Sequence, residues 1–198
     1  IKNILCITGD SVKAGDQKNT KAVHEFESVK LLKQIQTFNN GIDPTNKLLS
    51  DNKTEIFAGA AADPSYKNLK ILKMRTMKKK EAGARFIQTQ MIMDKQYLVN
   101  FCDEISKPLN LPVLAGVFLL KSYKNALFIN KFVPGANIPA DILNRLKESS
   151  NPIEEGINIA AEQSREFIDI AQGVHLMAVK SEHLIPEILK RAEINLEY

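Results

Sequence analysis

The sequence has few cysteines and no long apolar run, and both shortages limit what the chain can be. Its two cysteines, Cys6 and Cys102, have neither metal-ligand spacing nor the density of a disulfide scaffold. We therefore expect two buried free thiols. No apolar run approaches the roughly 20 residues that cross a bilayer, and no charged and then apolar leader opens the sequence. These absences predict a cytoplasmic globular protein without a membrane segment.

The sequence also lacks the patterns of nucleic-acid and dinucleotide binding. Its formal charge of +4 comes from lysines spread over several predicted helices, apart from a cluster at 78–80. Without an arginine-rich tract or alternating basic and aromatic residues, no nucleic-acid partner is expected. No G-x-G-x-x-G motif follows the first apolar segment, which argues against a dinucleotide-binding Rossmann domain.

Three familiar sets of catalytic residues are missing as well. The strand ends carry no Ser-His-Asp set, no pair of carboxylates at one exit and no cluster of histidine and cysteine. Hydrolysis by a protein nucleophile and a bound metal are therefore not expected. A polar pocket without its own strongly reactive group indicates that a cofactor supplies the chemistry.

The sequence does not begin with methionine, and its first residues, IKNILCI, already have the pattern of a buried strand. We therefore expect that structural elements before this strand are missing.

The stretch from Glu81 to Asp94 shows how the chain is organised. Lys78, Lys79 and Lys80 close a predicted helix where the helix dipole favours cations, and Gly83 suits the positive-φ position that ends it. An apolar strand follows and ends in Gln88, Thr89 and Gln90. In α/β folds ligands bind at this end of the strands.

The same alternation runs along the rest of the chain. We predict caps at Asp94, Ser122 and Asn151, a helix end before Pro108, and a helix end at Gly173. The predicted strands are Ile4–Ile7, Glu55–Ala60, Arg85–Thr89, Leu111–Phe118 and Val174–Val179. The predicted helices are Phe26–Phe38, Leu69–Ala82, Tyr97–Ile105, Tyr123–Phe132, Ala140–Lys147, Asn151–Gln172 and His183–Ile194.

Strands that alternate with helices through short loops predict an α/β fold with a parallel sheet covered on both faces. Two architectures compete: an open doubly wound sheet, and a (β/α)8 TIM barrel that would need three further strands. The abrupt start of the sequence accounts for missing strands, so we predict a partial barrel. It forms a single domain over residues 1–198 that lacks its N-terminal strands.

Six segments together resemble the methylenetetrahydrofolate reductase family, in particular its bacterial and acetogen-type members. The resemblance runs in order through nearly all of the chain. The segments are LCITGD at Leu5–Asp10, ESVKLL at Glu27–Leu32, GAAADP at Gly59–Pro64, MKKKEAGARFIQTQ at Met77–Gln90, NKFVPGANIP at Asn130–Pro139 and GVHLMAV at Gly173–Val179.

The resemblance implies a flavin-binding (β/α)8 barrel with this chain as its last five units. Such an enzyme passes a hydride from NADH or NADPH through FAD, with FMN as the alternative, to 5,10-methylenetetrahydrofolate and forms 5-methyltetrahydrofolate. It implies a folate substrate, a nicotinamide cosubstrate and a role in one-carbon metabolism and methionine biosynthesis. A partner electron-transfer subunit is an open alternative as donor, and we expect an oligomer because two free sheet edges need cover.

The resemblance also assigns residues, with Asp10 as the catalytic residue near both flavin and folate. A carboxylate beside a flavin opposes negative charge on the reduced ring. Gln90 matches the glutamine that hydrogen-bonds the pterin, and Tyr123 an aromatic that stacks on substrate or nicotinamide. The cofactor-binding positions that the resemblance assigns are Ile7, Thr8, Gly9, Asp10, His24, Glu25, Gly59, Ala61, Arg75, Lys78 and Lys79.

Simpler roles remain open for several of these residues. Asp10 can cap the loop after its strand, Lys79 can be an ordinary charge at a helix end, and Tyr123 can pack on the surface. The role of His24 is ambiguous. His175 alternates with apolar neighbours, which favours a core histidine whose hydrogen bonds are satisfied.

The general acid of the family is a glutamate on the first strand, which this chain lacks. A non-catalytic partial barrel that binds flavin, folate or a partner reductase subunit is therefore the alternative function. A phosphate-handling barrel aldolase or isomerase is disfavoured, because no lysine lies within a predicted strand.

Overall fold

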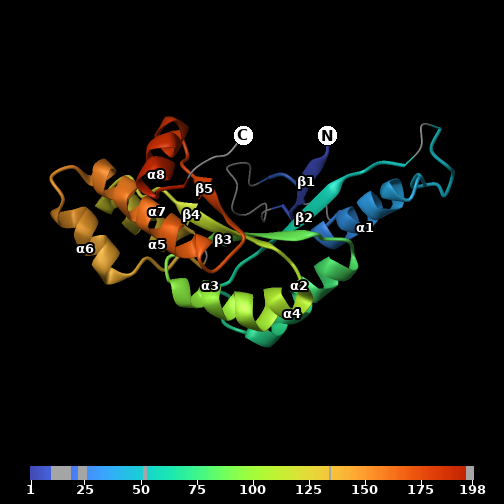
Figure 1. Cartoon of the computed structure of the whole chain (residues 1–198), viewed down its shortest axis with the longest axis horizontal. Helices are drawn as coiled ribbons and strands as arrows, with labels where there is room; N and C mark the ends of the chain where they lie inside the picture. The colour runs from blue at the N-terminus through green and yellow to red at the C-terminus, as the bar shows by residue number, and fades with distance from the viewer. Residues whose placement is uncertain (10–18, 22–25, 51–52, 134, 195–198) are drawn as a thin grey trace.

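Five parallel strands pair in their order along the chain in this computed structural model (Figure 1). The structure describes residues 1–9, 19–21, 26–50, 53–133 and 135–194. The strands are β1 (Asn3–Cys6), β2 (Phe57–Ala62), β3 (Phe86–Met91), β4 (Val113–Phe118) and β5 (Gly173–Met177). The helical elements are α1 (Ser28–Asn39), α2 (Leu69–Glu81), α3 (Lys95–Phe101), a π-helical turn η2 (Cys102–Ser106), α4 (Lys107–Leu109), α5 (Tyr123–Phe132), α6 (Ala140–Glu148), α7 (Pro152–Ile168), a short 3-10 turn η3 (Glu182–Leu184) and α8 (Ile185–Arg191).

The helices lie on the convex side of a curved sheet (Figure 1). Right-handed crossovers between neighbouring parallel strands put every connecting helix on the same side. Strands in sequence order, with helices outside, form the wall of a (β/α)8 barrel, so the predicted partial barrel is confirmed. The prediction that helices would cover both faces was wrong, because only a strand order that reverses direction sends helices to the second face. In the described part of the chain, no helix covers the concave face.

Local sequence signals set several helix ends as predicted. The Asp94 side chain accepts a hydrogen bond from the backbone N–H of Gln96, and Ser122 accepts one from that of Asn125. Gly83 has a φ of 110° and follows the lysines that end α2. Asn151 occupies the N-cap position of α7, but its side chain makes no capping hydrogen bond.

Several predicted boundaries were wrong. The second strand begins at Phe57 and extends to Ala62, because its end pairs with Thr89 of β3. The third helical segment does not stop before Pro108: it continues through η2 into α4, where the proline occupies the first turn and needs no backbone donor. α7 ends at Ile168, and Gly173 is the first residue of β5.

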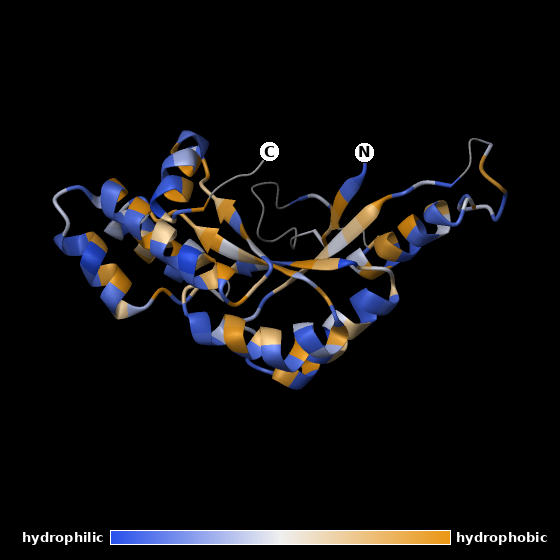
Figure 2. Ribbon diagram, in the orientation of Figure 1, coloured by the Kyte–Doolittle hydropathy of each residue, from blue (hydrophilic) through white to orange (hydrophobic). Residues whose placement is uncertain are grey.

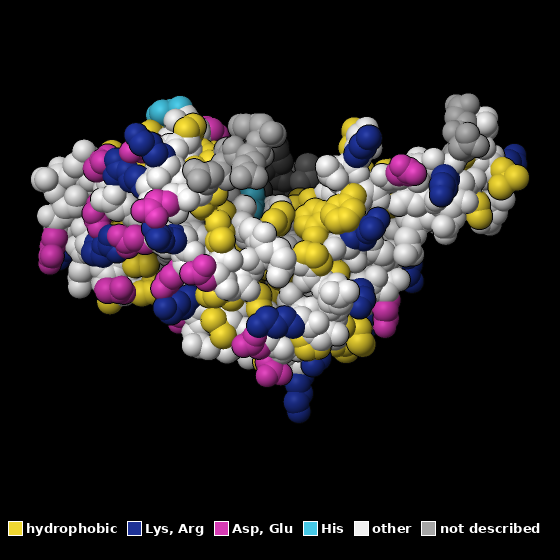
Figure 3. Space-filling model, in the orientation of Figure 1, with side chains coloured by type: hydrophobic (Ala, Val, Ile, Leu, Met, Phe, Trp, Pro, Cys, Tyr) yellow, Lys and Arg dark blue, Asp and Glu magenta, His cyan; other side chains and the backbone are white. Residues whose placement is uncertain are grey.

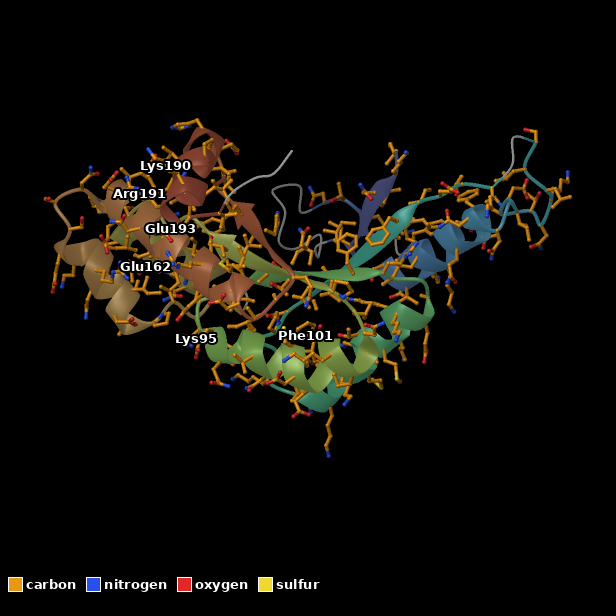
Figure 4. The ribbon with its side chains drawn as sticks, viewed as in Figure 1. Lys95, Phe101, Glu162, Lys190, Arg191 and Glu193 are labelled. Atoms are coloured by element: carbon orange, nitrogen blue, oxygen red, sulfur yellow. The ribbon has the colours of Figure 1, made fainter. Side chains whose placement is uncertain are left out.

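The hydrophobic core lies between the sheet and the helices. Figure 2 shows mostly apolar strands and helices whose apolar residues alternate with polar ones. Phe101 is completely buried on α3 and lies between that helix and the sheet (Figure 4). Cys6 and Cys102 are buried and free, as predicted. Among the residues that the structure describes, no helix is long and apolar enough to cross a membrane.

Candidate functional site

A cavity of about 410 Å³ lies at the carboxyl ends of β1 and β2. In barrels of this type, ligands bind at this end of the strands. Six residues that the sequence predicted for a cofactor or substrate line the cavity together: Ile7, Thr8, Ala61, Arg75, Lys79 and Gln90. The strand ends and α2 therefore bring together residues that are more than eighty positions apart in the chain.

Lys79 ties α2 to the end of β2. Its Nζ donates a hydrogen bond to the backbone carbonyl of Ala61, at 2.6 Å. Burial is the main cause that lowers the pKa of Lys79, and the neighbouring charge of Arg75 lowers it further, while Glu27 acts in the opposite direction. The cavity therefore has a positively charged wall whose ammonium group is partly withdrawn from water.

Arg75 supplies the second cation of this wall. Its guanidinium carbon lies 4.9 Å from the centroid of the Tyr66 ring, which also lines the cavity. Stacking on an aromatic face restricts the guanidinium while leaving its N–H groups available. Two cations one turn apart on one helix can bind a phosphate that lies within their reach, and no other special arrangement is needed.

Thr8 shapes the opposite wall by contacting the start of α1. Its Oγ1 lies 3.2 Å from both the backbone nitrogen and the Oγ of Ser28. It accepts from the backbone N–H and so satisfies one of the donors that the first helical turn leaves free. The N-terminus of α1 is thereby held beside the cavity.

A β-bulge in β3 sets the direction of Gln90. The register shifts between Gln88 and Met91, so that two residues of β3 oppose one of β4. Thr89 holds the bulge, since its Oγ1 accepts from the N–H of Gly116 and donates to the Gln90 carbonyl, both at 2.8 Å. A Cβ on Gly116 would lie 2.5 Å from that carbonyl oxygen. The close approach of the two strands thus requires glycine here.

Four predicted residues that the structure describes do not line the cavity. Lys78 is exposed on α2, and Gly9 is exposed beyond β1. Gly59 lies beneath the Phe86 ring, where a Cβ would come within 2.2 Å of the ring. Tyr123 packs against the cluster formed by α5, α6 and neighbouring strands, with its ring centroid 6.0 Å from the Nζ of Lys147.

Three further predicted residues, Asp10, His24 and Glu25, lie outside the described residues. Their roles, including the catalytic role of Asp10, stay predictions.

Sequence reasoning missed three polar residues of the cavity wall: Ser28, Tyr66 and Thr76. Asp63, which also lines the cavity, directly follows a strand, and the sequence predicts pocket residues at such strand exits. Its Oδ1 accepts hydrogen bonds from the backbone N–H and the hydroxyl of Ser65 at 3.0 and 2.6 Å. No sequence pattern identifies Tyr66 as a site residue. Only its contact with Arg75 does so, and that contact depends on the fold.

A larger cavity, of about 820 Å³, lies between α3, α6 and α7, in the helical layer. Its charged residues are mostly paired: Lys95 binds Glu166 at 2.7 Å, and Arg145 binds Glu162 and Glu155. Figure 4 shows Lys95 on α3 and Glu162 on α7. We place the candidate site in the smaller cavity because it lies at the strand ends and contains two cations, Lys79 and Arg75, that form no ion pair with a described residue.

The concave face carries apolar and polar groups. Phe57 and Phe86 stack with their centroids 5.5 Å apart, and Figure 3 shows hydrophobic side chains gathered over β2. The prediction of a satisfied core histidine was wrong for His175, whose buried Nδ1 has no hydrogen-bond partner within the described ranges. In those ranges, no group of three or more histidine, cysteine, aspartate or glutamate residues is placed to hold a metal ion.

The strand order and the cavity define a protein of the βα-barrel class with its candidate site at the carboxyl ends of the strands. The family model for methylenetetrahydrofolate reductase matches residues 1–193, and the chain belongs to that family.

Comparison with known proteins also supports the fold. No curated protein matches the sequence. Among solved structures, the chain is similar to an uncharacterized protein from Clostridium thermocellum that binds two copies of 5-methyl-5,6,7,8-tetrahydrofolic acid. The identity is 17% and the TM-score 0.54, and the match covers 71% of this chain and 54% of that one. At this identity the likeness supports the fold, and the present chain spans about half the length of its neighbour.

Proposed function

We propose that the chain forms part of a flavin-dependent oxidoreductase that reduces 5,10-methylenetetrahydrofolate to 5-methyltetrahydrofolate, with NADH or NADPH as the electron donor. Membership of the methylenetetrahydrofolate reductase family supports the reaction class. The methyltetrahydrofolate bound by the structural neighbour supports a folate ligand. We further propose that residues 1–198 act as a single barrel-type domain.

One observation carries this proposal. The cavity at the strand ends places two cations, Lys79 and Arg75, and a primary amide, Gln90, around small side chains such as Ala61. Cations suit the phosphates of FAD or FMN, and small side chains let a flat ring approach the strand ends. An amide offers both donors and an acceptor to a pterin. The residues that are present therefore fit a flavin and a folate.

The residues of this chain would bind and orient, and a bound flavin would supply hydride transfer between nicotinamide and folate. In this proposal Lys79 and Arg75 hold the cofactor phosphates, and the Ala61 carbonyl keeps the Lys79 ammonium in place. Gln90, fixed by the β3 bulge, orients the pterin. The roles of Asp10 toward the reacting ring and of Tyr123 toward substrate or nicotinamide rest on the family resemblance alone.

The experiment is a titration of the full chain with FAD and with FMN, followed by addition of NADH or NADPH. We expect the bound flavin to bleach and then regain its colour when methylenetetrahydrofolate is added. The variant Gln90→Ala should bleach normally but regain colour more slowly. A chain that binds neither flavin nor 5-methyltetrahydrofolate at millimolar concentrations would rule the proposal out.

An alternative function is ligand binding without catalytic turnover. The small number of acid groups in the cavity favours it. Among the described lining residues Asp63 is the one carboxylate, and one of its oxygens already accepts two hydrogen bonds from Ser65. Within the described part of the cavity, no second carboxylate accompanies Asp63 to serve as a general acid. In that case the protein would bind flavin, folate or a partner electron-transfer subunit, and flavin would bind without being bleached.

The sheet edges support an oligomeric or complexed state. Within the described residues, β1 and β5 each pair with a single neighbouring strand, which leaves one side of each without a partner. Unpaired edges promote association with another chain. We propose that strands outside the described residues cover these edges, supplied by the rest of the barrel or by another subunit.

A further inference from the structure

His175 is half-buried on β5, and its Nδ1 is an exception among the buried polar atoms of this protein. The atom is excluded from solvent and has no hydrogen-bond partner among the residues described. Native proteins pair the large majority of such atoms, so an unpaired one needs an explanation. Hydrogen bonding by Nδ1 within the described residues therefore does not account for a histidine at this position.

The concave face contains this side chain. Ala61 pairs with Gln88, Gln88 with Leu114, and Leu114 with Gly173. Residues that pair directly across a parallel sheet share a face, and so do residues two positions apart on one strand. His175 is two residues beyond Gly173, so it lies on the same face as Ala61, which lines the candidate site.

The position beside His175 has no side chain. His175 pairs with Gly116 of β4, and Gly116 pairs with Met91 at the end of the β3 bulge. Neighbouring strands lie about 4.8 Å apart, so two strand spacings of about 10 Å separate β3 from β5. The backbone carbonyls of Thr89 and Gln90 fill the space beside Gly116, where a Cβ would lie 2.5 Å from the Gln90 oxygen. A flat heterocycle that contacts both the Gln90 amide and the His175 imidazole must therefore span the two strand spacings above the bulge.

The surroundings also determine where the imidazole carries its proton. Burial lowers the pKa of His175, so the ring is neutral at physiological pH. A proton on Nδ1 would leave an unpaired buried donor, which is rarer in proteins than an unpaired acceptor. The favoured tautomer has its proton on Nε2, and the side chain then offers a single neutral N–H donor.

We propose that His175 is a positioning residue whose Nε2–H donates a hydrogen bond to a carbonyl oxygen or ring nitrogen of a flat heterocycle bound on the concave face. This inference rests on the proposed function, since both flavins and pterins carry such acceptors. It adds β5 to a site that otherwise uses β1, β2, β3 and α2.

The test uses the full chain and four variants. His175→Phe keeps a ring but removes the donor, and His175→Ala removes the donor without adding bulk. His175→Gln places an amide N–H close to the position of Nε2. His183→Phe is the matched control, because His183 is exposed on η3 in the segment that follows β5. Circular dichroism and thermal melting check that each variant is folded.

Each protein is titrated separately with FMN, with FAD and with 5-methyltetrahydrofolate. We expect His175→Phe and His175→Ala to weaken binding of one ligand class about tenfold, which is typical for a lost hydrogen bond. His175→Gln should restore affinity to within about threefold, and His183→Phe should leave it unchanged. The ligand class that responds identifies the heterocycle, and a change in the absorption spectrum of bound flavin would assign the contact to the isoalloxazine ring.

Three results would overturn the inference, and they differ in whether the proposed function fails as well. If the wild-type chain binds a flavin or the folate and His175→Ala binds it equally well, the assignment of His175 fails alone. If the wild-type chain binds none of the three ligands, the proposed function and the role of His175 fail together. A loss of affinity that His175→Gln does not restore in a folded protein would also count against a donor role.

Discussion

The Nζ of Lys79 donates a hydrogen bond to the backbone carbonyl of Ala61, at 2.6 Å, and so joins α2 to the end of β2. A lysine in this position has a lowered pKa because burial costs its charged form more than its single carbonyl partner returns. The arrangement leaves an incompletely solvated ammonium group at the cavity. An anionic group such as a phosphate would restore the missing interactions.

The first prediction concerns this lysine. Lys79→Met should weaken FMN and FAD binding by about tenfold to a hundredfold, since hydrogen bonds to charged groups contribute about 1.5–3 kcal/mol. Stability should fall little, because the substitution also removes the cost of burying the charge. Fluorescence titration with each flavin measures the affinity, and urea unfolding measures the stability.

Lys78→Met is the matched control for Lys79. It removes the same charge from the same helix at an exposed position that does not line the cavity. If both variants lose equal affinity, the effect reflects the net charge of α2, and the specific role of Lys79 is refuted.

The second prediction concerns the close contact between β3 and β4. Gly116→Ala would place its Cβ 2.5 Å from the Gln90 carbonyl oxygen, so backbone must move. We expect a loss of about 1–3 kcal/mol in the free energy of unfolding, as is typical of overpacked sites. Gly9→Ala is the control, because a Cβ there meets nothing within 4 Å. Equal stability of the two variants in urea would contradict the proposed packing.

Sequence alone predicted the order of elements and the parts of the site that follow directly from it. Alternating strands and helices give a parallel sheet, and the carboxyl ends of its strands collect Ile7, Thr8, Ala61 and Gln90 at one edge. Helix spacing then places Arg75 and Lys79 one turn apart on the helix that covers β2. No long-range contact needs to be known for these inferences.

Contacts between distant residues could not be predicted in the same way. The β3 bulge depends on a hydrogen bond from Gly116 to Thr89, 27 residues apart, and nothing local in either segment indicates it. Ser28 reaches the cavity because it contacts Thr8, 20 residues earlier. The unpaired nitrogen of His175 is likewise a property of its surroundings, which alternation along a strand does not describe.

The third prediction links the bulge to substrate binding through Thr89. Thr89→Val keeps the shape and the β-branching of a buried side chain, but it removes both hydrogen bonds of the hydroxyl, one accepted from the Gly116 N–H and one donated to the Gln90 carbonyl. We expect a loss of about 1–3 kcal/mol in stability and weaker binding of 5-methyltetrahydrofolate. The binding loss should come from Gln90, whose direction the bulge sets.

A double-mutant cycle separates the two effects of Thr89→Val. If Thr89 acts through Gln90, then Thr89→Val should reduce folate affinity in the wild-type background but add little to Gln90→Ala. Independent and additive losses would show that the bulge does not position the amide. Stability is measured for all four proteins, so that only folded chains are compared.

The fourth prediction is a pH dependence of stability that originates in His175. Burial lowers the pKa of its imidazole below the ordinary value of 6.5, so the unfolded chain takes up a proton more readily than the folded one. The neutral form therefore supports the fold at and above neutral pH. That support is lost as the pH falls from about 7 toward the lowered pKa of the folded state.

Urea unfolding at pH 7.5 and 5.5 should show a decrease in stability that is smaller in His175→Phe. Carboxylates also titrate at low pH, but they do so equally in both proteins, so the difference between them isolates the histidine. His183→Phe should follow the wild type, because that side chain is exposed on η3. A decrease in His175→Phe as large as in the wild type would show that the buried imidazole is not the source.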